Sequence, residues 1–434
     1  MKRLFLLLVC VGLSVTAISQ TERAIDPSLA NQYFQEARSV SEKDMGQLWG
    51  VPIYGPMMFA DPNTRFVVAN QADANGLLRK EGAVFVGTLP EDAGIANTAT
   101  KWSGVTWTMV MWPLPSERQR RVRLMMHELF HRLQDSLKLA GANPTNRHLE
   151  SRDGRIWLRM ELRALERALF EQGTVRRDAV ADAIYFRRYR QSLFQGSAAE
   201  ENALETNEGL SEYTGVKLSA RSDNEALIRS SYSVRVAGSD QSFTRSFAYA
   251  TGPAYALLLD STGAKWRRTI KSGDDLSTML QNAMRIKLPA VSLNEASARA
   301  GRYDGDEVFA SETVREKRRQ ETVAKYRAQL VDGPVLALPI GSSFSYTFDP
   351  NNVTAFEELG LVYPTARVTD DWGILEVTDG VLMFRDAGVI KKLQVAAPAS
   401  AGALQGTGWK LRLNDDWELA PGDRKGDFLV RKKS

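Results

Sequence analysis

The chain has 434 residues, of which 43% are hydrophobic and 25% charged. This is ordinary usage for globular proteins, with room for two or three domains, and it excludes a disordered, collagen-like or multi-spanning membrane protein. Lysine and arginine number 56 against 52 acidic residues. So slight an excess in a chain of this length does not favour nucleic acid as a partner.

Residues 1–19 are typical of a secretory signal peptide. Two basic residues come first, an apolar run follows over Leu4–Leu13, and Ala17–Ser19 supplies small residues two apart, as signal peptidase requires. We therefore expect cleavage after Ser19 and export to the periplasm or the extracellular medium. The single cysteine, Cys10, lies in this segment, so the mature chain would fold without disulfides. No later apolar run is long enough to predict a membrane span.

Residues 20–115 have a β-rich composition. After one predicted helix near Leu29–Gly46, short runs of strand-forming residues are separated by Gly, Pro, Asn and Asp. These predicted strands are Arg65–Ala69, Ala83–Thr88 and Val105–Trp112.

Residues 116–333 have helical periodicity instead. Ser116 and Gln119 match a capping box, and apolar residues follow at helical spacing from Val122 to Leu137, which predicts a helix beginning at Ser116. Further helices are predicted over Ile156–Phe170, Arg176–Phe194, Pro253–Asp260, Asp275–Met284 and Glu312–Gln329.

Residues 334–434 return to strand-like patterns. Ile374–Thr378 and Val381–Arg385 flank Asp379-Gly380, a dipeptide that favours β-hairpin turns. Trp409–Leu413 alternates strictly between apolar and polar residues. The fold class expected is therefore α+β: a catalytic unit with a β-rich N-terminal part and a helical part, followed by an all-β C-terminal domain.

The sequence His127-Glu128-Leu129-Phe130-His131 matches the HExxH pattern and contains two of the three histidines. On a helix, residues i and i+4 lie on one face, so both imidazoles can bind one Zn²⁺. Glu128 would then lie beside the open coordination position, where it can take a proton from water as a general base. The alternative is a pair of polar histidines on an amphipathic helix. The scarcity of histidine and the secretory context favour the metal.

A third ligand has to come from elsewhere, because no HExxHxxGxxH extension follows His131. The stretch Asn207-Glu208-Gly209, with Glu212 one turn later, resembles the Asn-Glu-Gly segment of aminopeptidase-N-like enzymes and the Asn-Glu segment of thermolysin-like ones. This resemblance to the gluzincins implies a zincin-like catalytic unit, with Glu208 as the third zinc ligand. It also implies that Glu212 hydrogen-bonds the first ligand, His127. The alternative is that Glu205, Glu208 and Glu212 form a solvated acidic helix face.

A further match lies in Phe247–Pro253, which resembles the Tyr-x-x-Gly start of a helix in aminopeptidase-N-like enzymes. There the tyrosine hydrogen-bonds the oxyanion, so the resemblance implies this role for Tyr249. Attack of water on an amide does build a negative oxygen that a phenol can stabilise. Tyr255 is a second choice, and the alternative for Tyr249 is simple packing at a helix N-terminus.

The chain departs from the gluzincins in two ways. Residues 132–207 separate His131 from Glu208, a far longer interval than in the better-known members, and we interpret the surplus as an inserted helical hairpin beside or over the cleft. The Gly-x-Met-Glu-Asn stretch that captures a free amino terminus is missing, so aminopeptidase specificity does not carry over. We expect Gly104–Trp112 to be an edge strand that could hold an extended peptide by backbone pairing.

Other polar residues have competing interpretations. His148 could bind substrate or metal, or be an ordinary loop histidine. Glu161 and Glu166 are alternative ligands, although salt-bridged surface residues are the better interpretation. The basic run Arg187–Arg190 is expected to be a solvated helix face.

These patterns predict a secreted or periplasmic zinc-dependent hydrolase, a peptidase that acts on peptide or protein substrates. Zn²⁺ would be held by His127, His131 and Glu208, with Glu128 as the general base. The competing hypothesis is a non-enzymatic exported binding or scaffold protein on a zincin-like fold. The intact Glu128 argues for the enzyme, because a scaffold has no need of an acid at that position.

Overall fold

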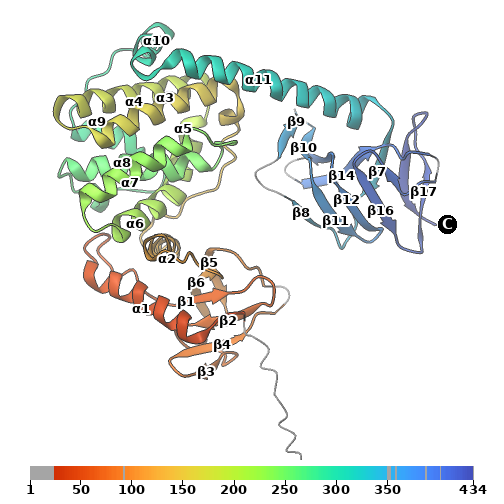
Figure 1. Ribbon diagram of the computed structural model, residues 1–434, viewed down its shortest axis with the longest axis horizontal. Helices are drawn as coiled ribbons and strands as arrows, with labels where there is room; N and C mark the ends of the chain where they lie inside the picture. The colour runs from red at the N-terminus through yellow and green to blue at the C-terminus, as the bar shows by residue number, and fades with distance from the viewer. Residues whose placement is uncertain are drawn as a thin grey trace, which may run out of the picture. The chain divides into compact units, whose positions relative to one another are not determined.

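The computed structural model describes residues 24–90, 93–348, 353–356, 359–386, 389–400 and 402–433. The fold is α+β, as expected: a six-stranded sheet comes first, a helical region follows, and β-sheets form the C-terminal part (Figure 1). The predicted signal peptide, residues 1–19, lies outside the described residues. Within the part of the chain that is described, no helix is long and apolar enough to cross a membrane.

The chain divides into two compact units, each assembled from separate segments. The first contains the described residues up to Pro144, together with Glu201–Ser231 and Ala248–Arg285. The second contains Thr145–Glu200, Tyr232–Phe247 and the described residues from Ile286 onward.

The six-stranded sheet of the first unit has the order β3-β4-β2-β1-β6-β5. Its strands are β1 Met57–Ala60, β2 Phe66–Ala69, β3 Arg79–Glu81, β4 Val84–Thr88, β5 Thr98–Trp102 and β6 Val105–Met111. The pairing of β1 with β6 is parallel, with Met57 opposite Thr108, and the other pairings are antiparallel. The expectation that Gly104–Trp112 is an edge strand is wrong, because β6 is paired on both sides and β5 forms that edge.

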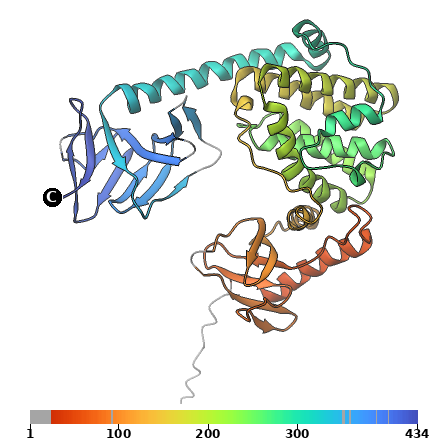
Figure 2. The ribbon, with the colours of Figure 1, turned by 180° about the vertical axis from the view of Figure 1, so that it is seen from behind.

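Two helices, α1 (Pro27–Asp44) and α2 (Arg118–Leu133), lie beside this sheet (Figure 2). Phe34 of α1 stacks on Phe59 of β1, with 4.4 Å between ring centroids, so α1 covers the sheet through buried aromatic contact.

The predicted capping box at the start of α2 is wrong. The N-cap residue is Glu117, whose side chain makes no capping bond. The Gln119 amide instead donates to the Ser219 carbonyl and to Glu225. These two contacts direct the end of the Gln119 side chain toward Ser219 and Glu225 and away from the helix terminus, where a capping box would need its amide oxygen as an acceptor.

The remaining helices of the described chain are α3 Arg152–Phe170, α4 Gly173–Leu193, α5 Ser197–Leu204, α6 Leu210–Ser219, α7 Asp223–Ala237, α8 Ser246–Ser261, α9 Leu276–Ala283, α10 Leu293–Ala300 and α11 Gly305–Arg327. A π-helical turn, η2 (Glu205–Gly209), joins α5 to α6. The consecutive helices α3 and α4 form the predicted helical hairpin of the second unit, with Glu171 and Gln172 between them.

The C-terminal strands of the second unit form two sheets around one core. The seven-stranded sheet has the order β17-β18-β7-β14-β13-β10-β9, and the five-stranded sheet β15-β16-β12-β11-β8. Leu336 and Leu393 of the first sheet share a hydrophobic cluster with Leu375 and Leu411 of the second. The strands are β7 Val335–Pro339, β8 Ser345–Phe348, β9 Thr354–Phe356, β10 Gly360–Tyr363, β11 Ala366–Asp370, β12 Gly373–Val377, β13 Val381–Asp386, β14 Val389–Ala396, β15 Gln405–Gly406, β16 Trp409–Leu413, β17 Trp417–Pro421 and β18 Phe428–Lys432.

The predicted hairpin around Asp379-Gly380 is wrong. Strand β12 pairs with β11 and β16, whereas β13 pairs with β10 and β14 in the other sheet. The N–H groups of Thr378 and Asp379 donate to the Gly408 carbonyl, and that of Gly380 donates to Pro364. The turn therefore carries the chain from one sheet to the other.

Candidate metal centre

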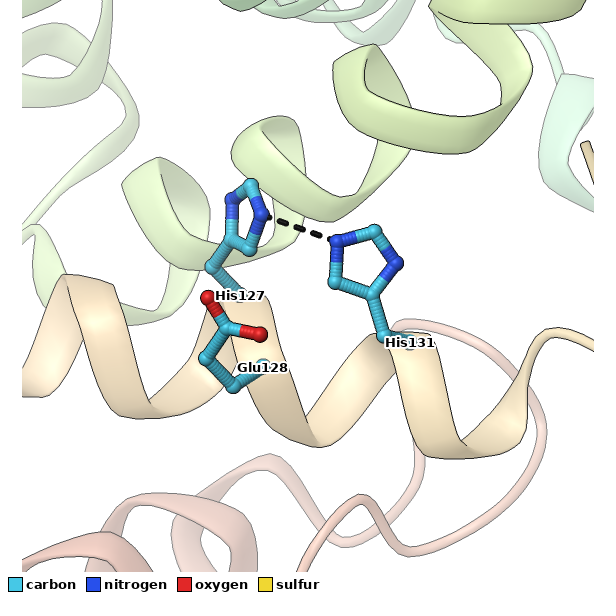
Figure 3. A group of neighbouring side chains, drawn as sticks. All are labelled: His127, Glu128 and His131. Atoms are coloured by element: carbon cyan, nitrogen blue, oxygen red, sulfur yellow. Dashed lines mark hydrogen bonds between the residues drawn. The ribbon is translucent and has the colours of Figure 1, made fainter. Parts of the chain in front are cut away.

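The HExxH residues lie on α2 with their ligand atoms close together. His127 and His131 are one turn apart, and Figure 3 shows both imidazole rings on one side of the helix, with 3.0 Å between their Nε2 atoms. Within the described ranges, His127, Glu128 and His131 form a group whose possible ligand atoms all lie within 4.8 Å of one another. The predicted i, i+4 placement of the histidines is confirmed.

Glu208 extends this group from η2. Its Oε2 lies 3.6 Å from His127 Nε2 and 3.5 Å from His131 Nε2. A tetrahedral zinc with bonds of about 2.0–2.2 Å holds its ligand atoms roughly 3.3 Å apart, and the three observed separations bracket that value. The two nitrogens and the carboxylate oxygen therefore fit a zinc ion. The alternative of a solvated acidic face is wrong, because Glu205, Glu208 and Glu212 are all buried.

Glycines let the helices of the site approach closely. A Cβ on Gly252 of α8 would lie 2.4 Å from the Cα of Gly209 in η2, and one on Gly215 of α6 would lie 2.6 Å from the Arg123 carbonyl of α2. Neither position has room for a side chain. The backbone of α8 therefore contacts the backbone of η2, and the backbone of α2 contacts the backbone of α6. This explains the glycines next to Glu208 and in the Tyr-x-x-Gly segment.

Glu212 holds His127 from the side opposite the candidate metal. Its Oε2 lies 2.8 Å from His127 Nδ1, and Arg123 pairs with the same carboxylate. A carboxylate that pairs with arginine only accepts hydrogen bonds, so Nδ1 carries a proton. The other ring nitrogen, Nε2, faces Glu208. This is the contact that the resemblance implied.

The charge around His127 is strongly negative. Burial alone lowers the pKa of His127, but hydrogen bonds with Glu208 and Glu212 outweigh it and raise that pKa to about 10. Burial would raise the pKa of Glu208, whereas His127, His131 and Tyr249 together hold it well below its usual range. The arrangement therefore favours a positive charge among these side chains, as a bound cation would supply.

Glu128 has a different environment. Its side chain is buried, and Oε2 has no hydrogen-bond partner among the described residues. Burial raises its pKa, although the two neighbouring histidines act in the opposite direction. A buried acceptor without a partner costs free energy, and a water molecule or a substrate group at the candidate metal would supply the missing donor.

Tyr249 lies in α8 beside the proposed ligands. Its hydroxyl donates to Glu208 Oε2, and its ring stacks on His127 with 5.7 Å between centroids and 4° between planes. The structure thus brings Tyr249 to the site, as the resemblance implied. Tyr255, the second choice, is fully buried in the same helix.

Two further residues contact His131 and were not found from the sequence. Its Nδ1 lies 2.7 Å from Gln134 Oε1 and 3.2 Å from Ser211 Oγ. The available signal was spacing: Gln134 is three residues after His131, and Ser211 is three residues after Glu208, so each is a neighbour of a predicted ligand on a helical surface.

The other candidate residues lie in the second unit. His148 is in a short 3₁₀ helix (η1, Arg147–Glu150). Glu161 pairs with Arg187 and Arg190, and all three side chains are fully buried. The expectation of a solvated face over Arg187–Arg190 is therefore wrong, because these arginines neutralise a buried carboxylate. Glu166 forms an ion pair with Arg235, which agrees with its interpretation as a salt-bridged residue.

Comparison with protein-family models, curated proteins and solved structures gives no match to this chain. The site is therefore interpreted from its own geometry. That geometry combines two imidazole nitrogens, one carboxylate oxygen and a second, buried carboxylate with one oxygen that has no partner in the described part of the chain, all within the first unit.

Proposed function

We propose that the protein is an exported zinc-dependent hydrolase of the gluzincin type that cleaves peptides or proteins. One observation carries the proposal: His127 Nε2, His131 Nε2 and Glu208 Oε2 converge beside the buried carboxylate of Glu128, whose Oε2 has no partner among the described residues. Export rests on the signal-like composition of residues 1–19.

His127, His131 and Glu208 would hold the zinc, and Glu212 would keep His127 in the ligand orientation. When bound, zinc supplies Lewis-acid polarisation of a substrate carbonyl and lowers the pKa of water. The choice of zinc follows from the donors, since two imidazoles and one carboxylate are a common catalytic zinc set that leaves one position open.

Glu128 would act as the proton carrier. It takes a proton from the attacking water and returns it to the leaving amine. The position of Glu128 supports this role, because its buried carboxyl group lies beside the two histidines and its Oε2 has no hydrogen-bond partner among the described residues. The Tyr249 hydroxyl would donate to the substrate oxygen as negative charge develops on it.

The proposal is tested with the purified mature protein and an unstructured protein substrate such as casein. We expect peptide release that disappears with a chelator and returns on addition of zinc. A protein that binds one zinc per chain, yet cleaves neither peptides nor esters, would contradict the enzymatic proposal and favour a binding or scaffold protein.

A further inference from the structure

We propose that Gln134 is a positioning residue that sets the tautomer of His131 and holds the backbone that carries Glu208. The inference rests on the proposed function, because it concerns two of the three proposed zinc ligands. Gln134 directly follows the last residue of α2, and its side chain is almost completely buried.

The orientation of the Gln134 amide follows from its partners. Its Nε2 lies 3.0 Å from the carbonyl oxygens of both Thr206 and Asn207. Carbonyl oxygens only accept hydrogen bonds, so the amino end of the amide has to face them. The oxygen end therefore faces His131, 2.7 Å from Nδ1. That oxygen accepts only, so Nδ1 carries the proton and Nε2 keeps its lone pair for a metal.

Ser211 leads to the same tautomer by an independent route. Its hydroxyl donates to the Asn207 carbonyl at 2.7 Å, which uses its single hydrogen. Toward His131 Nδ1, at 3.2 Å, the Ser211 oxygen can then only accept. Two side chains, one directly after α2 and one in α6, thus require the same proton on the same nitrogen.

Gln134 also supports the π-helical turn that carries Glu208. Such a turn departs from the regular i to i−4 bonding of an α-helix, and buried carbonyls near it need other donors. The carbonyls of Thr206 and Asn207 receive the Gln134 amide, and Asn207 also receives Ser211. One side chain therefore holds His131 directly and Glu208 through the backbone of η2.

Two substitutions separate these roles. Gln134→Met keeps the approximate length of the side chain and removes both the acceptor and the donors. Gln134→Glu keeps an acceptor for His131 but has no hydrogen to donate to the two carbonyls when ionised. Gln119→Met is the matched control, because it loses amide bonds to Ser219 and Glu225 at the opposite end of α2 from Gln134.

The readouts are nitrogen NMR of ¹⁵N-labelled histidine and zinc affinity by competition with a chelator. With three histidines in the chain, the ring signals can be assigned by substituting each in turn. In the wild type without metal, at a pH where the ring is neutral, we expect His131 with its proton on Nδ1.

In Gln134→Met we expect the Nε2–H tautomer to gain population and zinc affinity to fall about 10–100-fold. Gln134→Glu should keep the tautomer and still bind zinc more weakly, while Gln119→Met should match the wild type in both readouts. A wild type with the proton on Nε2, or Gln134→Met with unchanged tautomer and zinc affinity, would overturn the inference. Failure of the wild type to bind zinc would instead contradict the proposed function, because the tautomer is measured without metal.

Discussion

Glu128 and Glu212 are buried carboxylates of the same site, yet their surroundings move their pKa values in opposite directions. Burial raises the pKa of both, and for Glu128 burial prevails. For Glu212, the hydrogen bond with His127 and the charge of Arg123 outweigh burial and lower the pKa. Glu212 is thus suited to remain a permanent anion, whereas Glu128 is suited to exchange a proton.

The first prediction concerns Glu128→Gln. Glutamine keeps the shape of the side chain and leaves all proposed ligands in place, but it cannot take a proton. We expect hydrolysis to fall on the order of 10²–10⁴-fold, with zinc content unchanged. Steady-state kinetics and metal analysis of the same preparation check this. Loss of zinc together with activity would mean that Glu128 is structural.

The second prediction concerns Tyr249→Phe, which removes one hydroxyl and keeps the ring stacked on His127. The hydroxyl donates to the same oxygen of Glu208 that faces the histidines, so it lies beside the candidate metal. We expect kcat/KM to fall about 10²-fold with zinc retained. A variant that loses zinc but shows full activity once zinc is in excess would show that Tyr249 only positions Glu208.

The third prediction concerns pH and the N-terminal sheet. Burial alone would raise the pKa of Asp73, but hydrogen bonds from the Ser103 hydroxyl and from the N–H groups of Leu77 and Leu78 outweigh it and lower the pKa to about 2. Its ionised form therefore stabilises the fold above about pH 4, the usual unfolded value, and this contribution is lost as the pH falls through about 2.

Asp73→Asn should accordingly lower the free energy of unfolding by about 1–3 kcal/mol at neutral pH. The difference from the wild type should shrink as the pH falls from about 4 toward 2. Urea unfolding at several pH values measures it. A difference that is constant over this pH range would show that the charge of Asp73 does not contribute.

At the scale of elements, the periodicity of apolar residues predicted those strands and helices whose pattern is visible in the local sequence. The strands β2, β4 and β6 and the helices α3, α4 and α9 lie close to their predicted ranges, whereas α11 begins at Gly305 and not at Glu312. β1 was missed because every residue in it is buried, so it shows no alternation between apolar and polar positions.

The hairpin predicted around Asp379-Gly380 was wrong for a similar reason, namely burial. β13 is covered on both faces: Met383 lies in the core between the sheets, and Leu382 packs with Tyr326 and Leu330. A turn dipeptide predicts a reversal of the chain, but it does not determine which neighbours the following strand pairs with. Those neighbours are set by tertiary packing.

The fourth prediction tests the helix crossing at Gly252. Alanine there would bring a methyl group 2.4 Å from Gly209 Cα, which forces α8 away from η2. We expect a loss of about 1–3 kcal/mol of stability from overpacking, together with weaker zinc binding. Gly301→Ala is the control, since a Cβ there meets nothing within 4 Å. Wild-type stability and zinc affinity in Gly252→Ala would contradict the close contact.

At the scale of the whole molecule, the candidate site draws on segments that are distant in the sequence. Spacing alone predicted that His127 and His131 share one helix face, whereas Glu208 lies beyond residues 132–207 and was predicted only through resemblance to a family. Gln134 and Ser211 act by hydrogen bonds whose partners become neighbours only after folding. The chain between His131 and Glu208 enters the second unit and returns to the first, an excursion that loop-closure entropy penalises only weakly.

The most direct test of the central claim is zinc content per chain after dialysis, measured by mass spectrometry. We expect one zinc in the wild type and far less than one in Glu208→Gln, because a neutral amide is a poor zinc ligand. Glu205→Gln, in the same π-helical turn but hydrogen-bonded to Thr251, should retain one. A wild type without zinc, or Glu208→Gln with one zinc per chain, would contradict the account.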